Sequence, residues 1–272
     1  MLKRIIGAFA VLLLKAIGRL PPIVATILGE ATLPVYALIR KRTRRRLVRL
    51  QPPVSARTYY RMRLRLALQS LQHFNGRYDG STIRIEGSSL YADALASGNP
   101  VVLFGWHQGP VELLHQIPAR NAPAHPFFLM TASAFSPELA EWMSRGRRIS
   151  GVTVIRPGDT ALLRGWARCE SGPGVLALMI DQVPGQTENW MTFQKGRVRI
   201  PIPTRLLDWI GARRPECLAV SVVLEGAHDT VFRFTRVRPE ALRADLSVEM
   251  EKALTRAPEQ YNWSYGKIAV GG

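Results

Sequence analysis

Short apolar runs recur along the central and C-terminal parts of the chain, between longer segments in which apolar residues return every three or four positions. The short runs have the length and composition of buried strands, and the longer segments have helical periodicity. This alternation predicts an α/β fold in which helices flank a mixed central sheet. The runs that predict strands are 83–87, 101–106, 127–130, 152–155, 175–180, 218–224 and 231–237.

Helical periodicity is clearest in two segments. Apolar residues recur at helical spacing through 58–74, and arginines occupy many of the remaining positions. This segment is predicted to be an amphipathic basic helix. A second helix, over 242–254, packs by one apolar stripe and ends before Ala257 and Pro258, because proline cannot continue a helix.

The first forty residues contain the longest apolar runs of the chain. Residues 5–14 are apolar without a break, whereas 20–39 includes Glu30 and three prolines. A spanning helix needs about 20 apolar residues, so the first run is short and the second would cross a bilayer only with distortion. A signal peptide is disfavoured because Lys15 and Arg19 interrupt the region and no small-x-small cleavage site follows cleanly.

Basic residues are concentrated beside these apolar runs. The first fifty residues hold eleven Lys or Arg and one acidic residue, with the sequence RKRTRRR at 40–46. Such a cluster next to an apolar segment binds anionic lipid on the cytoplasmic face, at about 1 kcal/mol per basic residue. The alternative is a solvated helix face. We therefore predict a membrane-associated segment over 1–50 and one folded domain over 51–272.

The whole chain is also strongly basic, with 37 Lys and Arg, 20 Asp and Glu, and a formal net charge of +17. Nucleic acid, anionic lipid headgroups and an acidic carrier protein are the partners that this charge attracts. The sequence contains no zinc-ligand spacing and no RNP-like pattern, which disfavours nucleic acid. Cys169 and Cys217 show no paired spacing, and the five histidines offer no ligand set, so buried free thiols and no metal are expected.

The strongest candidate for chemistry follows the apolar run 101–106. His107 comes directly after this run and Glu112 lies five positions later. Residues at strand ends in α/β sheets face the ligand crevice, and a helix starting near Gly109 would let Glu112 fold back towards the imidazole. A carboxylate there fixes the tautomer of a histidine that removes a proton from a substrate hydroxyl. The alternative is a capping histidine beside a helix-start glutamate.

These residues belong to a pattern that resembles the bacterial lipid A late acyltransferases, the lauroyl and myristoyl transferases of the wider H-x4-D/E glycerolipid acyltransferase superfamily. The resemblance runs from Leu2 to Ile268 and its motifs occur in the family's order. After the apolar and basic start, they are Ile85-Glu86-Gly87, Val101-Val102-Leu103 before His107 and Glu112, Asp181-Gln182 with Gly185, and Ala257-Pro258-Glu259-Gln260-Tyr261-Asn262-Trp263.

The resemblance implies that His107 and Glu112 form the catalytic dyad. It also implies that Arg156, an arginine suited to binding phosphate, holds the acceptor or the phosphate of the acyl carrier. Asp181 and Gln182 fall in a further block and are expected to contact substrate. Asp181 directly follows the apolar run 175–180, and an acid at such a strand end can either bind an acceptor or position a basic residue.

By the same resemblance, residues 51–272 form an O-acyltransferase domain at the cytoplasmic face of the cell inner membrane. The donor would be an acyl thioester of acyl carrier protein or of CoA. The acceptor would be a hydroxyl of a membrane lipid such as a lipid A precursor. The reaction would need no metal or redox cofactor. The chain departs from the family at Val183 and over 131–137, segments expected to touch substrate. Another glycolipid, an amino-lipid or a pigment remains an alternative acceptor, and a non-catalytic membrane-binding protein is the alternative class.

Overall fold

The computed structural model describes most of the chain, in a series of ranges separated by short gaps. It describes residues 11–39, 41–75, 83–114, 125–130, 137–148, 152–155, 159–170, 172, 174–181, 190–193, 197–225, 229–265 and 268–270.

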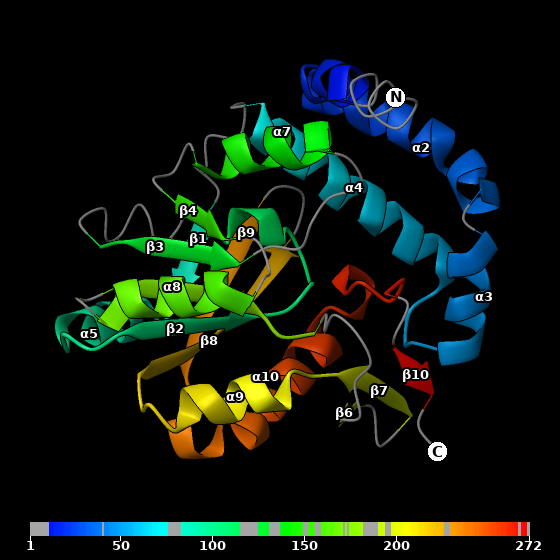
Figure 1. Cartoon of the computed structure of the whole chain (residues 1–272). Helices are drawn as coiled ribbons and strands as arrows, with labels where there is room; N and C mark the ends of the chain where they lie inside the picture. Colours follow the sequence, from blue (N-terminus) through cyan, green and yellow to red (C-terminus); the bar gives the residue numbers. More distant parts are fainter. Residues whose placement is uncertain are drawn as a thin grey trace.

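A seven-stranded mixed sheet forms the centre of the protein, as predicted (Figure 1). The five strands from β8 to β4 run parallel, β9 is antiparallel to β8, and β1 is parallel to β9. Each of the seven apolar runs forms one of its strands. In spatial order these are β1 (Ile83–Glu86), β9 (Asp229–Arg236), β8 (Glu216–Glu225), β2 (Val101–Gly105), β5 (Val175–Met179), β3 (Phe127–Met130) and β4 (Val152–Ile155).

Helices surround this sheet, and residues 11–18 are also helical. The helix predicted over 58–74 begins two residues earlier, because the hydroxyl of Ser55 accepts a hydrogen bond from the amide of Thr58 at 3.1 Å and caps it. The helices are α2 (Pro22–Ile39), α3 (Lys41–Leu50), α4 (Ala56–Phe74), α5 (Ser88–Ala96), α7 (Pro137–Arg148), α8 (Asp159–Glu170), α9 (Thr204–Gly211), α10 (Leu242–Arg256) and the short 3-10 helices η1 (Val111–Leu113), η2 (Pro239–Ala241) and η3 (Pro258–Gln260).

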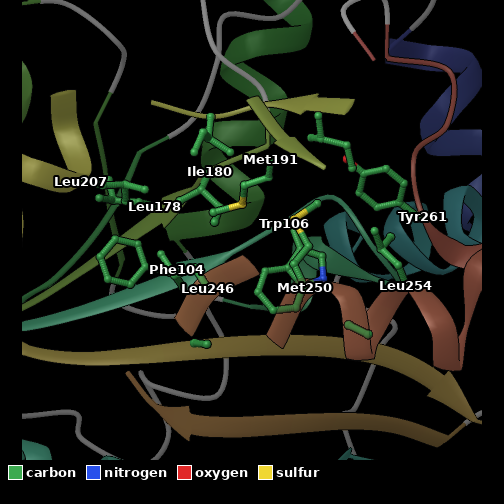
Figure 2. Close-up of a cluster of buried hydrophobic side chains, with 14 of the residues drawn as sticks. Phe104, Trp106, Leu178, Ile180, Met191, Leu207, Leu246, Met250, Leu254 and Tyr261 are labelled. Carbon is green, nitrogen blue, oxygen red and sulfur yellow. The ribbon is translucent and has the colours of Figure 1, made fainter. Parts of the chain in front are cut away.

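Side chains of the central strand β2 alternate between two apolar cores, because successive residues of a strand point to opposite faces. Val101 and Leu103 pack with residues of α5 on one face. Val102 and Phe104 pack on the other face, in a cluster that includes residues of α8, α9 and α10 (Figure 2). Both faces of the sheet are therefore covered, which explains the unbroken apolar run.

A second, three-stranded sheet was not predicted from the sequence. It is antiparallel, in the order β10-β7-β6; β6 and β7 follow each other closely along the chain, whereas β10 is distant from both. These strands are short, and the pairing of β10 with β7 is decided by tertiary contacts rather than by local pattern. They are β6 (Trp190–Phe193), β7 (Val198–Pro201) and β10 (Ala269–Val270).

The N-terminal helices pack against the rest of the protein. α2 contacts α4, and α3 contacts β10; the Arg46 guanidinium of α3 donates a hydrogen bond to the carbonyl of Ile268, the residue before β10. α3 buries Thr43, Leu47 and Leu50 and exposes arginines on its other side. No helix within the described ranges is both long and apolar enough to span a bilayer. Residues 5–10 of the predicted apolar run 5–14 lie outside the described residues.

Candidate active site

The register of two parallel strands brings His107 and Asp181 together. Gly105 of β2 is paired with Met179 of β5, and the amide of Ile180 donates to the carbonyl of Gly105 at 2.9 Å. His107 and Asp181 each lie two residues beyond those paired positions, so both leave the sheet at the same edge. Carboxyl ends of parallel strands are where ligands bind in α/β sheets.

Asp181 holds His107 by two hydrogen bonds. Its Oδ2 accepts from the backbone amide of His107 at 2.8 Å, and its Oδ1 is 2.8 Å from the imidazole Nδ1. The carboxylate side chain is 1% exposed, whereas the imidazole is 28% exposed. A carboxylate that accepts from Nδ1–H keeps the proton on that nitrogen and leaves Nε2 with the lone pair. This arrangement directs Nε2 of the partly exposed ring away from Asp181, a geometry that is suited to general-base chemistry.

A left-handed turn after His107 depends on glycine. Gly109 has φ +64°, and a Cβ added there would lie 2.1 Å from the carbonyl oxygen of Val222. Side chains other than glycine adopt this region rarely, and here the space is also filled by backbone. The close approach of this turn to β8 thus requires Gly109 and sets the path of the chain between His107 and η1.

Gln108 ties the same turn to α10. Its side chain is fully buried, and its Nε2 donates to the carbonyls of Ala253 at 2.7 Å and Ala257 at 2.9 Å. Its Oε1 accepts from the indole Nε1 of Trp106 at 2.9 Å. Each polar atom of this buried amide has a partner, so the residues on both sides of His107 are held in one position.

The C-terminal segment after α10 completes this support. The amide of Asn262 donates to the carbonyl of His107 at 2.9 Å, and the amide of Gly109 donates to the carbonyl of Gln260 at 3.2 Å. The Gln260 side chain pairs with both backbone groups of Leu224, at 2.7 Å and 2.8 Å. Residues about 150 positions beyond His107 in sequence therefore fix its main chain.

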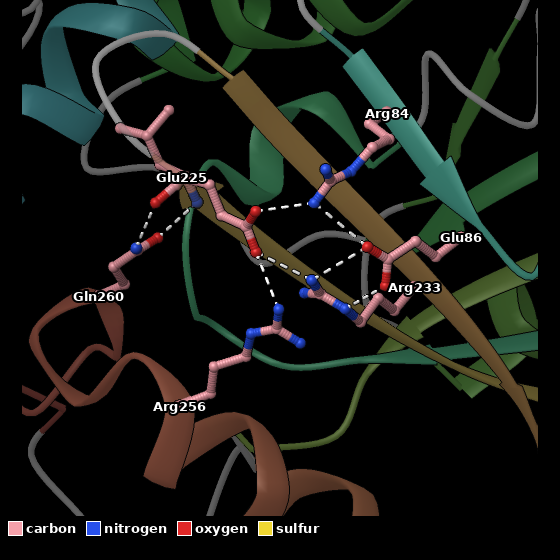
Figure 3. A network of polar contacts seen from close by, with 7 residues as sticks. Arg84, Glu86, Glu225, Arg233, Arg256 and Gln260 are labelled. Carbon is pink, nitrogen blue, oxygen red and sulfur yellow. Dashed lines mark hydrogen bonds and ion pairs between the residues drawn. The ribbon is translucent and has the colours of Figure 1, made fainter.

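A network of charged side chains anchors this segment to the end of β8 (Figure 3). Glu225 lies next to Leu224 and forms ion pairs with Arg84 at 2.8 Å, Arg233 at 2.9 Å and Arg256 at 3.1 Å. The hydrogen bond from Arg233 is the largest of the causes that lower the pKa of Glu225, so the carboxylate keeps its charge below the pH at which glutamate usually titrates.

Tyr261 pairs with the residue that follows His107. It forms an isolated antiparallel bridge with Gln108, and its side chain is completely buried. Burial, followed by the negative charge of Asp181, raises the pKa of Tyr261 well above its ordinary value. The phenol is therefore neutral over the whole physiological pH range, with its proton available for donation.

Of the other predicted site residues, the structure describes Glu112 but not Arg156 or Gln182. Glu112 lies in η1 and is partly buried, one short turn after Gly109, which agrees with the predicted helix start. Because Asp181 occupies Nδ1 of His107, the orienting role predicted for Glu112 stays a prediction. Arg156 and Gln182 lie outside the described residues, so their predicted substrate contacts remain predictions too.

The two cysteines are buried free thiols, as expected. Burial is the first cause that raises the pKa of each thiol to about 12, and neighbouring glutamates add to it. These glutamates are Glu170 beside Cys169, and Glu216 and Glu240 near Cys217. Neither cysteine is a thiolate at neutral pH, so neither offers a sulfur nucleophile.

Sequence reasoning placed Asp181 at a strand end but did not pair it with His107. Each of these polar residues directly follows a buried apolar run, and this much is visible in the sequence. The order of the strands in the sheet was needed to show that the two runs are neighbours. Gln108, Gln260 and Tyr261 carried no local signal for support of the site, since nothing in their spacing tells where the C-terminal segment docks.

Comparison of the sequence with protein-family models gave no match, and no curated protein matches it either.

Proposed function

We propose that the protein is an O-acyltransferase that moves a fatty acyl group from an acyl thioester to a hydroxyl of a membrane lipid. The observation that carries this proposal is the His107–Asp181 pair, in which a buried carboxylate occupies Nδ1 and Nε2 is left to act on substrate. The resemblance of the surrounding motifs to the lipid A late acyltransferases supports the choice of reaction.

In the proposed reaction, Nε2 of His107 removes the proton of the acceptor hydroxyl, and the oxygen attacks the thioester carbonyl. Asp181 stabilises the imidazolium that forms. A C–O bond forms and the C–S bond breaks, and the imidazolium returns the proton to the departing thiolate. The substrate itself supplies the nucleophile, which fits a protein whose two cysteines are un-ionised at neutral pH.

Acyl carrier protein is the proposed donor, with acyl-CoA as the alternative thioester. The net charge of +17 suits an acidic carrier, because opposite charge speeds association. A lipid A precursor is the proposed acceptor, and a different glycolipid, an amino-lipid or a pigment is the alternative within the same chemistry. The mechanism requires no metal or redox group.

The test is transfer of label from acyl carrier protein carrying a radiolabelled acyl chain to a total membrane-lipid extract. We expect one lipid class to gain the chain, and mass spectrometry of that lipid identifies the acceptor. The His107→Asn variant is the matched control and should label the same lipid at least about 10²-fold more slowly. Failure of the wild-type protein to label any lipid, with either carrier protein or CoA as donor, would contradict the proposed function.

We further propose that the N-terminal helices bind the cytoplasmic face of the cell inner membrane. Apolar side chains of this region are exposed, among them Leu12, at 66%, and Ile27, at 62%. The neighbouring helix α3 exposes four arginines, at positions 42, 44, 45 and 49. Exposed apolar and cationic side chains in adjoining helices are the combination that binds anionic lipid surfaces.

Replacing these four arginines by glutamine should weaken binding to anionic vesicles by about 10³-fold, since each basic residue near such a surface contributes about 1 kcal/mol. The measurement is co-sedimentation with phosphatidylcholine vesicles that contain either 30 mol% phosphatidylglycerol or none. Binding to the neutral vesicles should change little.

The matched control replaces three exposed arginines of α8 and α9, at positions 164, 168 and 205, by glutamine. This variant also loses positive charge, but from helices on another part of the molecule (Figure 1). If both variants lose binding in proportion to their charge, the N-terminal helices are not the membrane-binding surface.

A further inference from the structure

Ion pairs divide the exposed arginines of the protein into two groups. On and beside β1, β9 and α10, arginines such as Arg84, Arg238 and Arg256 pair with neighbouring carboxylates. On α8 and α9, Arg164 and Arg205 are exposed and form no ion pair with any described residue. A surface charge that is not paired within the protein keeps its attraction for an oppositely charged partner.

The arginines of α8 and α9 lie on neighbouring helices. Trp166 of α8 and Trp209 of α9 meet edge to face, with ring centroids 5.2 Å apart (Figure 1). Along each helix, arginines recur at intervals of four or eight residues, which places them on one side of it. We call this surface the α8–α9 face. Its arginines, all exposed, are Arg164, Arg168, Arg205, Arg213 and Arg214.

One arginine of the α8–α9 face is held in place by an aromatic ring. The guanidinium carbon of Arg213 lies 3.9 Å from the ring centroid of Trp209, and its Nη1 donates to the Trp209 carbonyl at 3.0 Å. Stacking fixes a guanidinium and leaves its other N–H groups to bind a carboxylate. Asp208 of α9 pairs with Arg243 of α10, and Glu170 at the end of α8 is exposed. The face therefore keeps a net positive charge.

The α8–α9 face lies close to the edge of the sheet that carries the candidate active site. α8 packs against β5, the strand that Asp181 follows. Leu207 of α9 belongs to the same apolar cluster as Phe104 and Leu178 (Figure 2). These two strand residues lie three positions before His107 and Asp181, a span of about 10 Å. A protein bound to this face is therefore close enough for a flexible arm to reach the site.

The α8–α9 face differs from the membrane-binding helices in its apolar side chains. The N-terminal helices expose large apolar residues, among them Leu12, Ile27 and, in α3, Val48. No large apolar side chain is exposed among the described side chains of α8 and α9. Lipid surfaces bind apolar and cationic groups together, whereas an acidic protein surface needs only the cationic ones. The face is therefore suited to an acidic protein.

We propose that the α8–α9 face docks the acidic carrier protein that delivers the acyl thioester, with its arginines paired to carboxylates of the carrier. This inference rests on the proposed function, in which such a carrier is the donor. It gives the two basic surfaces of the chain different partners: α3 binds the anionic membrane, and the α8–α9 face binds the carrier. Because the two surfaces are on different parts of the molecule, both partners bind at once (Figure 1).

The test replaces Arg164, Arg205 and Arg214 by glutamine in the full-length protein. These side chains form no hydrogen bond or ion pair with other described residues, so the change removes charge with little effect on folding. Fluorescence anisotropy measures binding of a labelled bacterial acyl carrier protein. We expect Kd to rise about 10- to 100-fold at low ionic strength, the loss expected of three exposed ion pairs, and the difference to shrink as salt is added.

Activity gives a second measurement of the same variant. The ratio of kcat/KM with acyl carrier protein to kcat/KM with acyl-CoA should fall by the same factor, because CoA carries the thioester without the acidic protein. A loss of fold would lower both values together and leave their ratio unchanged.

The matched control is the variant of α3 in which the arginines at 42, 44, 45 and 49 are replaced by glutamine. It loses one charge more, from another surface, and its Kd for the carrier should change by less than about threefold because salt screens distant charges. An unchanged Kd in the α8–α9 variant, or equal losses per charge in both variants, would overturn the inference. Loss of vesicle binding with normal carrier binding in the α8–α9 variant would also overturn it, and would make the face a membrane surface.

Binding is measured without turnover, so failure of this inference and failure of the proposed function can be told apart. A wild-type protein that binds the carrier through this face but transfers no acyl group counts against the proposed function alone. A wild-type protein that transfers from acyl-CoA but binds no carrier counts against the docking surface alone.

Discussion

Replacing Asp181 by asparagine should lower acyl transfer by up to about 10⁴-fold, the size of effect that follows when the carboxylate behind a catalytic histidine becomes an amide. The amide oxygen would accept from the backbone amide of His107, as Oδ2 of Asp181 does now. The amide nitrogen would then face Nδ1 and donate to it. That contact favours the tautomer with its proton on Nε2, so Nε2 loses the lone pair that the proposed mechanism needs.

The matched variant is Glu112→Gln, which makes the same carboxylate-to-amide change at the acid of the H-x4-E motif. With Nδ1 of His107 already occupied by Asp181, we expect Glu112→Gln to be the more active of the two variants. Transfer from labelled acyl carrier protein measures both, and circular dichroism checks their fold. An active Asp181→Asn beside an inactive Glu112→Gln would return the orienting role to Glu112.

Replacing His107 by asparagine should lower transfer by about 10²- to 10⁴-fold, the contribution expected of a general base. Asparagine places an amide nitrogen near the position of Nδ1, so a donor to the buried Asp181 carboxylate is kept while the base is lost. This design separates chemistry from folding, because His107→Ala would also leave Asp181 without that donor.

Transfer rates under single-turnover conditions measure the loss, together with thermal unfolding of the same preparations. We expect unfolding of His107→Asn to resemble that of the wild-type protein more closely than His107→Ala does. Added imidazole should restore part of the activity of His107→Ala, because the imidazole ring is partly exposed and its site opens to solvent. If His107→Asn transferred acyl groups at the wild-type rate, His107 would not be the general base of the reaction.

The amino-acid sequence by itself determined the class of fold. Strands that are covered on both faces need apolar side chains at every position. Runs such as 101–106 and 175–180 can therefore be recognised as buried strands from their own residues alone. The stripe of α10 and the cap of α4 at Ser55 are likewise local, since helix periodicity and capping involve residues a few positions apart. The position of His107 at a strand end follows from the same local pattern.

Only the tertiary structure decided which groups surround His107. Parallel pairing of β2 with β5 places Asp181 on the imidazole, although 74 residues separate them in sequence. Docking of the C-terminal segment brings Gln260 and Tyr261 against the turn that follows His107, and β10 joins β7 from a distant part of the chain. Strand order and docking depend on the free energy of burying whole surfaces together, a quantity that no short stretch of sequence contains.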